Sequence, residues 1–326
     1  MNNKLSNVEI DSDSQHIVFG ATGAYGYAIV KKLLEKNIRV RAVVRNENKA
    51  LRLFPKNVEI VTADILNEEQ VAVACRDASV VYYCNNFPYR DWMKSFMGAT
   101  VNILKASEQW HPILIFPGNV YGYGEFKSNP VIESHPLSAI SKKGRLRNDI
   151  EALLLEYHRK GRINTIIPRF ADFYGPNVTN DLYGAMFRNA IKGKSALWPI
   201  NMDVSHNYTY IDDAAEATLL LAEDPEAFGK VFHVSGPVTT ARKFIGGIYN
   251  ALGSPIRIRV LSKTFLKLMS PFDSKVRGLL ELLYEYEGAY NIDDSAFRER
   301  YPSFRHTPCE IGIRNTLDWF KKTTLE

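Results

Sequence analysis

The sequence predicts an α/β fold, a Rossmann-like doubly wound parallel sheet with a smaller, mostly helical C-terminal substrate region. Three observations support this prediction. An apolar strand joins an amphipathic helix through three glycines at residues 16–36, apolar segments alternate with helical patterns as far as residue 168, and the alternation weakens after residue 177. Continuous apolar strands between helices are typical of a parallel sheet that is covered on both faces.

The first element, HIVFGATGAYGYAIVKKLLEK, predicts a dinucleotide site. Gly20 would let the chain turn out of the strand, Gly23 would let backbone N–H groups approach a pyrophosphate, and Gly26 would let the helix pack on the sheet. The anion would lie at the helix N-terminus, where the helix dipole favours negative charge. The spacing is GxxGxxG rather than GxGxxG, so the prediction depends on the flanking strand and helix. The residues expected to contact the cofactor here are Gly20, Thr22, Gly23, Ala24, Tyr25 and Gly26.

The second strand, IRVRAVV at residues 38–44, is followed by Arg45, where NAD sites usually place an acidic residue for the ribose hydroxyls. An arginine at this position favours a 2′-phosphate, so we expect NADP(H) rather than NAD(H). Arg41 and Lys49 are weaker candidates for the same contact. Alternatively, Arg41 and Arg45 form no more than a solvated strand end.

The later elements set the expected domain organisation. Further strands are expected at residues 57–61, 79–84, 112–116 and 163–168. The dinucleotide-binding domain would cover residues 1–177, and residues 206–235 would return to its sheet with NYTYI and VFHVS. The rest of residues 178–326 would form the smaller region over the strand ends, where substrates bind in such folds. The helical pattern of residues 263–290 predicts a core-facing helix pair, with a lid or a dimer face as alternatives.

Composition narrows the class of protein. With 326 residues and 45% hydrophobic content, the chain can bury a large core. The net charge of +5 is spread along the chain, which argues against a nucleic-acid partner. Cys75, Cys84 and Cys309 are too far apart for a disulfide framework or a metal site. The first fifteen residues contain no apolar signal core, and no later apolar segment has a membrane-spanning length, so we expect a cytoplasmic protein without a membrane partner.

Five motifs occur in an order that identifies a family. They are GATGAYG, TADIL, NVYGYG at 119–124, PRFADFYGP at 168–176 and YTYIDDAAEA at 208–217. Together they resemble the atypical and extended short-chain dehydrogenase/reductases, the superfamily that includes NAD-dependent epimerases and dehydratases. The resemblance covers nearly the whole chain.

The resemblance also implies cofactor contacts beyond the glycine turn. Asp64 and Ile65 would flank the adenine ring, and Asn85 and Asn86 would lie along the cofactor. The segment from Pro168 through Arg169 to Ala171 would approach the nicotinamide. Alternatively, Asp64 caps the helix that follows it, and the two asparagines satisfy loop backbone groups.

The catalytic positions depart from the family pattern. Members with the usual chemistry carry Ser or Thr just before the VYG segment and Tyr-x-x-x-Lys on the next helix. Here the hydroxyl position falls within Pro117, Gly118 and Asn119. The tyrosine position becomes Lys143 and the lysine position becomes Arg147, one helical turn apart on a shared face.

These replacements leave several roles open. Arg147 can supply charge and hydrogen bonds but cannot exchange a proton near neutrality. Lys143 could act as a general acid or base if burial and like charge lower its pKa, or it could bind a substrate carboxylate or phosphate. Asn119 could donate to a substrate carbonyl in place of the missing hydroxyl. Alternatively, the charges from Lys142 to Arg147 form a solvated helix start.

Other polar residues near the expected strand ends are weaker candidates. Tyr121 is the preferred tyrosine, ahead of Tyr89 and Tyr174, because its segment passes closest to the expected nicotinamide. His206 is expected to be a loop histidine bonded to backbone. Asp172 stands where relatives often have Asn.

Two functions follow from these observations. The first is an NADP(H)-dependent oxidoreductase, with epimerase- or reductase-like chemistry on a small polar carbonyl or sugar-like substrate. The second is a noncatalytic NADP(H)-binding sensor or regulatory protein, which the missing Ser and Tyr would favour. The fold cannot choose between these functions, because function depends on the site. The retained cofactor site favours the enzyme. We expect a small-molecule substrate, no metal and a possible homodimer.

Overall fold

The computed structural model describes residues 14–180 and 182–324, which form two compact units. The first unit contains the described chain up to Asn119, together with Arg145–Arg169 and Ala214–Phe232. The second unit contains Val120–Gly144, Phe170–Asp213 and the described chain from His233 onward.

The first unit is built on a sheet with the strand order β11-β7-β5-β4-β1-β2-β3, and β6 pairs with β7. Strands β1 to β5 and β7 all pair in parallel. Their carboxyl ends therefore meet at one edge of the sheet. The bounds are β1 (His16–Phe19), β2 (Val40–Val44), β3 (Glu59–Thr62), β4 (Val80–Tyr83), β5 (Ile113–Ile115), β6 (Gly118–Asn119), β7 (Asn164–Phe170) and β11 (Lys230–Val234).

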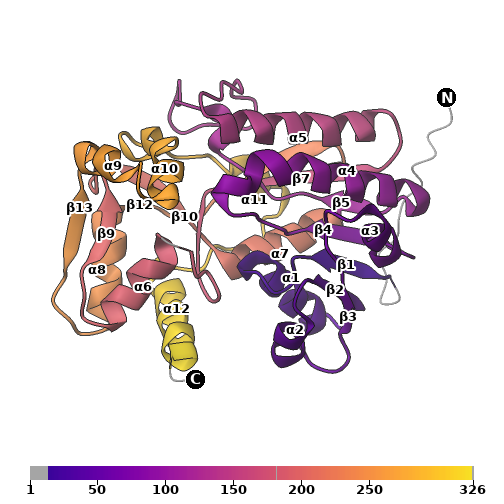
Figure 1. Ribbon diagram of the computed structural model, residues 1–326, viewed down its shortest axis with the longest axis horizontal. Coiled ribbons are helices and arrows are strands. Elements are labelled where there is room, and N and C mark those ends of the chain that lie inside the picture. Colours follow the sequence, from indigo (N-terminus) through magenta and orange to yellow (C-terminus); the bar gives the residue numbers. More distant parts are fainter. Residues whose placement is uncertain (1–13, 181, 325–326) are drawn as a thin grey trace. The chain divides into compact units, whose positions relative to one another are not determined.

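Helices cover both faces of this sheet, with α1, α2 and α7 on one face and α3, α4 and α5 on the other (Figure 1). Every residue of β1 and β4 is buried because both faces are covered, which explains their uninterrupted apolar character. The expected strands and the doubly wound fold are confirmed. The helix bounds are α1 (Ala24–Glu35), α2 (Glu47–Leu53), α3 (Glu68–Ala74), α4 (Trp92–Trp110), α5 (Lys142–Arg159) and α7 (Ile211–Ala222).

The second unit combines a sheet of order β12-β10-β8 with a two-stranded sheet of β13 and β9. Its strands are β8 (Asp172–Tyr174), β9 (Ala196–Pro199), β10 (Ser205–Tyr210), β12 (Val238–Thr240) and β13 (Ile258–Leu261). Its helices are α6 (Tyr183–Ile191), α8 (Ala241–Ala251), α9 (Lys263–Met269), α10 (Ser274–Leu280), α11 (Ser295–Arg300) and α12 (Cys309–Thr324), with the 3-10 turn η4 at Leu283–Tyr286.

Only one of the two strands predicted within residues 206–235 joins the central sheet. VFHVS forms β11 and joins the central sheet as expected, whereas NYTYI forms β10 and pairs with β8 and β12 instead. The aromatic side chains of β10 explain its place, because Tyr208 stacks on Phe244 of α8 at 4.2 Å between ring centres. His206 is consequently a buried strand residue, not a loop histidine. The functional division at residue 177 stays a prediction, since compactness does not show which residues bind substrate.

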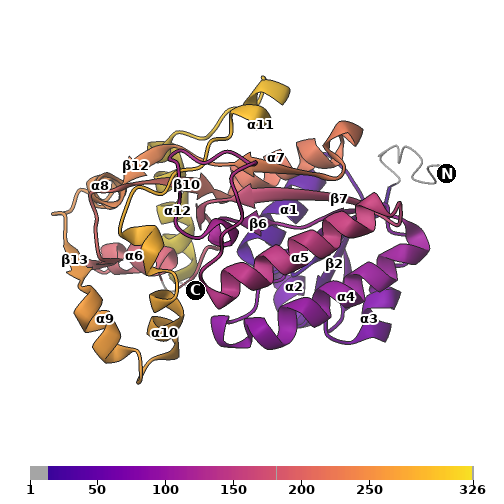
Figure 2. The same ribbon diagram turned by 90° about the horizontal axis from the view of Figure 1, so that it is seen from above.

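The predicted helix pair at residues 263–290 forms α9, α10 and η4. Leu266, Leu282 and Leu283 are buried as expected, but Leu268 and Phe272 are strongly exposed. The core-facing interpretation is therefore wrong for one side of this segment. Figure 2 shows α9 and α10 as a hairpin with a projecting connection. Across residues 14–180 and 182–324, no helix has the length and apolar character needed to cross a membrane.

Candidate functional site

The glycine turn between β1 and α1 has the geometry that its sequence predicts. Gly20 has a φ of +72°, and its carbonyl oxygen accepts the Gly23 N–H at 2.9 Å. A Cβ on Gly20 would lie 3.0 Å from the backbone of Asn85, and a Cβ on Gly26 would lie 2.5 Å from the Gly20 carbonyl oxygen. Both positions therefore require glycine for α1 to pack against the ends of β1 and β4.

The start of α1 is open to an anion. Its N-cap is Gly23, its first turn carries no acidic residue, and no side chain in the described part of the chain caps it. Thr22 and Ala24 are half-buried beside it. Tyr25 is turned inward, where its hydroxyl shares a 2.5 Å hydrogen bond with Thr218 of α7. Tyr25 thus anchors α1 through its side chain, and its backbone remains the candidate cofactor contact.

Arg45 and Lys49 lie near this turn, whereas Arg41 is bonded to other groups. Arg45 is exposed directly after β2, and Lys49 of α2 donates from Nζ to the Thr22 carbonyl oxygen at 3.0 Å. Arg41 instead donates to two backbone carbonyl oxygens at the end of α3, at 2.9 and 2.7 Å, and forms an ion pair with Glu59. Lys49 is therefore a better second candidate than Arg41 for a 2′-phosphate.

The loop after β3 gives Asp64 a local role that is not helix capping. Its Oδ1 accepts the Leu66 N–H at 3.0 Å, while its own N–H donates to the Gln70 side chain at 2.7 Å. The cap of α3 is Asn67, which accepts the Gln70 N–H at 3.0 Å. The capping alternative for Asp64 is wrong. Ile65 is buried beside it.

The two asparagines after β4 differ from each other. Asn86 is exposed, and its side-chain oxygen accepts the neighbouring Phe87 N–H at 3.0 Å. Asn86 therefore satisfies a loop backbone group, as the alternative interpretation expects. Asn85 lies against Gly20, and its Oδ1 is buried without a hydrogen-bond partner among the described residues. Buried acceptors are normally paired, so this oxygen marks a place where a ligand donor would complete the structure.

Gly118, one of the three residues among which the hydroxyl position is expected, has no room for a side chain. A Cβ there would lie 2.6 Å from Cγ of Arg169 and 2.9 Å from Oε1 of Glu151. Arg169 and Glu151 form a buried ion pair, in which the Arg169 Nη2 and Nε donate to Glu151 Oε2 at 2.6 and 3.0 Å. This pair fills the space that a hydroxyl-bearing side chain would need. Asn119 follows on β6 and is half-buried, and Pro168 is buried in β7.

Arg147 is a buried cation held by aromatic rings. Its guanidinium lies 4.3 Å from the ring centre of Phe116, 5.3 Å from that of Phe96 and 5.9 Å from that of Trp92. It also donates to the Pro117 carbonyl oxygen. Cation–π contacts gain strength when both partners are desolvated, as they are here. The solvated alternative is therefore wrong for Arg147.

Lys143 is also buried, and its partner is a carboxylate of the second unit. Its ammonium forms an ion pair with Glu281, and its backbone N–H donates to Glu281 Oε1 at 3.1 Å. Burial raises the pKa of Glu281, but hydrogen bonds and charge from Lys143 outweigh burial and lower that pKa overall. The solvated alternative holds for the exposed Lys142 and Arg145 but is wrong for Lys143.

Tyr121 belongs to the second unit, where it packs in part against an apolar cluster that includes Val120, Val131 and Ile292. The other suggested donors are less suitable. Tyr89 is exposed, and Tyr174 is buried with a pKa raised above its usual value by burial. These environments do not favour proton exchange near neutrality.

The second unit contains two carboxyl groups that influence each other's charge, those of half-buried Asp172 and buried Glu285. Asp172 on β8 accepts the Tyr183 hydroxyl at 2.7 Å, and burial raises the pKa of Asp172. Burial and the charge of Asp172 raise the pKa of Glu285 well above its usual range. Asp172 stands in a recognisable motif, but nothing near Glu285 in the sequence indicates the pairing.

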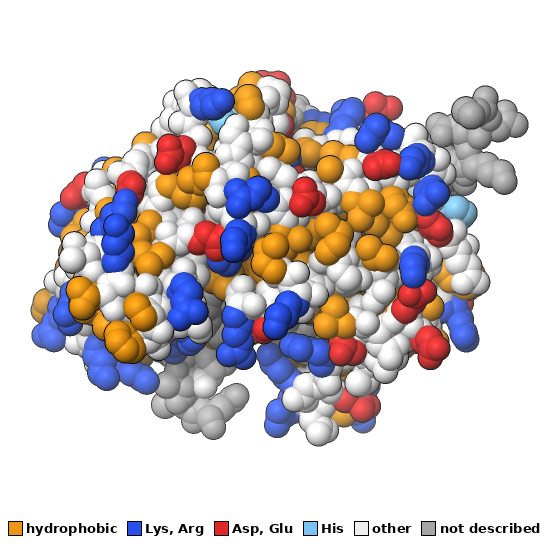
Figure 3. Space-filling view, turned by 45° about the horizontal axis from the view of Figure 1, so that its top comes forward, with side chains coloured by type: hydrophobic (Ala, Val, Ile, Leu, Met, Phe, Trp, Pro, Cys, Tyr) orange, Lys and Arg blue, Asp and Glu red, His pale blue; other side chains and the backbone are white. Residues whose placement is uncertain are grey.

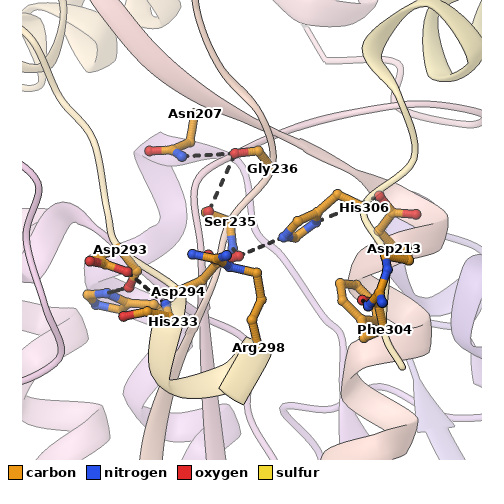
Figure 4. Close-up of polar contacts among 12 residues, drawn as sticks. Asn207, Asp213, His233, Ser235, Gly236, Asp293, Asp294, Arg298, Phe304 and His306 are labelled. Carbon is orange, nitrogen blue, oxygen red and sulfur yellow. Dashed lines mark hydrogen bonds and ion pairs between the residues drawn. The ribbon is translucent and has the colours of Figure 1, made fainter. Parts of the chain in front are cut away.

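Asp213 of the YIDDAAEA motif belongs to a second polar cluster (Figure 4). Asp213 accepts the Thr307 N–H at 2.7 Å, and His306 Nε2 forms a 2.6 Å hydrogen bond with Asp294. Arg298 donates to the same carboxylate at 2.7 Å. Burial alone would raise the pKa of Asp294, but His306 and Arg298 lower it to about 2. This cluster ties the motif to the chain that precedes α12. No group of three or more His, Cys, Asp or Glu in the described chain could hold a metal ion.

Comparisons with known proteins agree with this architecture. A curated relative from Methanocaldococcus jannaschii, a putative UDP-glucose 4-epimerase, is 27% identical over 63% of this chain and 72% of its own. The dTDP-glucose 4,6-dehydratase of Bacillus anthracis in complex with NAD superposes with a TM-score of 0.79 at 18% identity, covering 95% of this chain and 97% of that one. The UDP-glucose 4-epimerase of Thermus thermophilus in complex with NAD has a TM-score of 0.77 at 20% identity, covering 94% and 99%.

The family assignment rests on a longer match than any single motif. Residues 16–235, more than half of the chain, match the sequence model of the NAD dependent epimerase/dehydratase family. The family and these relatives are epimerases and dehydratases, which confirms the expectation of an enzyme. The chain belongs to the NAD dependent epimerase/dehydratase family.

Proposed function

We propose that this chain is an NADP(H)-dependent oxidoreductase that acts on a small polar carbonyl or sugar-like substrate. The observation that carries the proposal is the glycine turn, where the buried Oδ1 of Asn85 has no partner among the described residues, beside the uncapped start of α1. A nicotinamide dinucleotide would fit this turn with its pyrophosphate at the helix start and would supply or accept a hydride. The named activities of the relatives support a sugar-like substrate.

The choice of NADP(H) rests on Arg45 and Lys49. The two structural relatives are complexes with NAD, so the proposal departs from them on this point. Arg45 replaces the acidic residue that would repel a 2′-phosphate, and Lys49 holds a second positive charge at the Thr22 carbonyl. Two cations at this position favour the phosphorylated cofactor.

Calorimetric titration with NADPH, NADP+, NADH and NAD+ tests the cofactor assignment. The wild type should bind both NADP forms more tightly than the NAD forms. Replacing Arg45 with Ala should weaken NADPH by about tenfold or more, since charge-assisted hydrogen bonds are lost, and should leave NADH nearly unchanged. Arg52→Ala, at an exposed position of α2, is the matched control. Equal losses of affinity for NADPH and NADH would show that Arg45 does not bind the 2′-phosphate. Failure of every dinucleotide to bind would reject the proposal.

We assign proton transfer to Lys143 and positioning to Arg147 and Asn119. Lys143 stands at the family's tyrosine position and can both hold and release a proton, whereas the guanidinium of Arg147 stays protonated. Glu281 would hold the Lys143 ammonium in place through their ion pair. Tyr121 is the alternative proton donor.

Turnover measurements test this assignment, with NADPH oxidation followed over a set of sugar nucleotides and small carbonyls. Lys143→Met should abolish turnover while NADPH affinity stays nearly unchanged. Glu281→Gln, which removes the charge of the Lys143 partner but keeps a side chain of similar size, should retain turnover. If Tyr121→Phe abolishes turnover and Lys143→Met does not, the proton donor is Tyr121. Preferential binding of one redox form without turnover on any substrate would favour a sensor.

A further inference from the structure

The α9–α10 hairpin presents an apolar helix face to solvent. Phe265, Leu268 and Met269 of α9 follow an i, i+3, i+4 spacing, and Phe272 lies in the turn after α9; their exposed fractions are 44%, 68%, 38% and 85%, in that order. Leu266, which falls outside that spacing, is 1% exposed. The amphipathic pattern is therefore real, but its apolar stripe faces outward. Exposed apolar side chains gathered on one face mark an interaction surface.

Local contacts hold this hairpin in a folded conformation. Ser262 caps α9 by accepting the Phe265 N–H at 3.2 Å, and Asp273 caps α10. Arg277 donates to the carbonyl oxygens of Ser270 and Pro271 at 3.2 and 3.1 Å. The loop that carries Phe272 is thus fixed by α10, and Figure 2 shows that it projects away from the two helices.

Basic residues surround the apolar face. Residues 263–280 contain Lys263, Lys267, Lys275 and Arg277 against one acidic residue, Asp273. Lys263 forms an ion pair with Glu287 beyond the hairpin. Figure 3 shows hydrophobic side chains next to Lys and Arg side chains at the lower left of the face that it draws. Exposed Phe, Leu and Met within a basic border match the acyl boundary and headgroups of an anionic bilayer.

We propose that the α9–α10 hairpin, residues 263–280, docks this protein onto anionic lipid surfaces. A symmetric contact between two copies of the hairpin would bring the same basic side chains together, which disfavours a second copy of this chain as the occupant. An anionic bilayer complements both the charge and the apolar stripe. Docking of this kind requires no spanning helix. The proposal therefore departs from the sequence-based expectation of no membrane partner, which rested on the absence of a membrane-spanning segment.

Co-sedimentation of the full chain with vesicles tests this docking. The protein should bind vesicles of mixed phosphatidylcholine and phosphatidylserine, bind phosphatidylcholine alone weakly, and release as salt concentration rises. The combined change Leu268→Ser and Phe272→Ser should lower partitioning by about tenfold or more. Lys267→Gln and Lys275→Gln should each lower it by about fivefold. Leu51→Ser, at a position of α2 that is 59% exposed, should change nothing.

Clear outcomes would overturn the proposal. These are equal binding to neutral and mixed vesicles, absence of binding to both, or equal loss in the Leu51→Ser control. A dimer seen by sedimentation equilibrium that Phe272→Ser dissociates would make a second copy the occupant and would also overturn it. Circular dichroism of each variant verifies that the fold is retained. The single replacements Lys267→Gln and Lys275→Gln test the charge contribution and leave the apolar side chains intact.

Discussion

At the scale of single residues, Gly118 has no room for a side chain. The space beside its Cα is filled by the buried Arg169–Glu151 pair, so even a methyl group would collide with Arg169 Cγ at 2.6 Å. The chain thus carries two buried charges beside Gly118.

The steric explanation predicts unequal effects for two glycine replacements. Gly118→Ala should lower the free energy of unfolding by about 2 kcal/mol or more, because an ion pair must shift in a packed interior. Gly98→Ala, in α4 with no atom near the added methyl group, should raise it by up to about 1 kcal/mol through helix propensity. Urea unfolding measures both values. Equal effects would mean that the interior around Gly118 yields easily.

At the scale of elements, α5 carries three buried charged side chains. Lys143, Arg147 and Glu151 follow one another at intervals of one turn and share a face. Each is buried with its own partner: a carboxylate, aromatic rings and a guanidinium. The Glu151–Arg169 pair fixes α5 to the end of β7, where the carboxyl edge of the sheet lies.

This attachment predicts a large cost when one partner of the pair is removed. Glu151→Gln should lower the free energy of unfolding by about 3 to 5 kcal/mol, since Arg169 would keep a buried charge without its counterion. Glu108→Gln removes an exposed ion pair with Arg162 and should cost less than about 1 kcal/mol. Similar costs from thermal or urea unfolding would show that Arg169 finds another partner.

At the scale of the whole molecule, buried titratable groups make stability depend on pH in opposite directions. Burial lowers the pKa of His206 to about 4 from an ordinary 6.5, so the unfolded chain binds more protons between those values. Stability from neutral His206 is complete above pH 6.5 and falls as the pH drops toward 4. The raised pKa of Glu285 acts in reverse, because the unfolded carboxyl ionises first as pH rises above 4.5.

Two variants separate these contributions. His206→Gln should gain stability relative to the wild type as the pH falls from 6.5 to 4, by up to about 3 kcal/mol. Glu285→Gln should gain relative to the wild type as the pH rises above 4.5. Urea unfolding across pH 4 to 8 measures both differences. Parallel curves for the wild type and either variant would show that the group titrates alike in the folded and unfolded states.

Much of the fold was predictable because the signals are local. The strands at 16–20 and 79–84 are short apolar segments between helical patterns, and the three glycines at fixed spacing require one kind of turn. NYTYI carries an equally good strand pattern but pairs with β8 and β12. The periodicity and composition of a segment indicate that it forms a strand but not which strands it pairs with. The predicted place of NYTYI in the central sheet was therefore wrong.

The sequence by itself determined the doubly wound fold and the glycine turn, because each depends on spacing within a short stretch. The placement of Lys143 and Arg147 at the family's Tyr and Lys positions stays a prediction. The tertiary structure alone decided that Glu281 and Glu151 pair with Lys143 and Arg169, and that the stripe with Phe272 faces solvent. Partners distant in the chain meet only on folding. A periodic pattern shows which side chains share a face but not which face is buried.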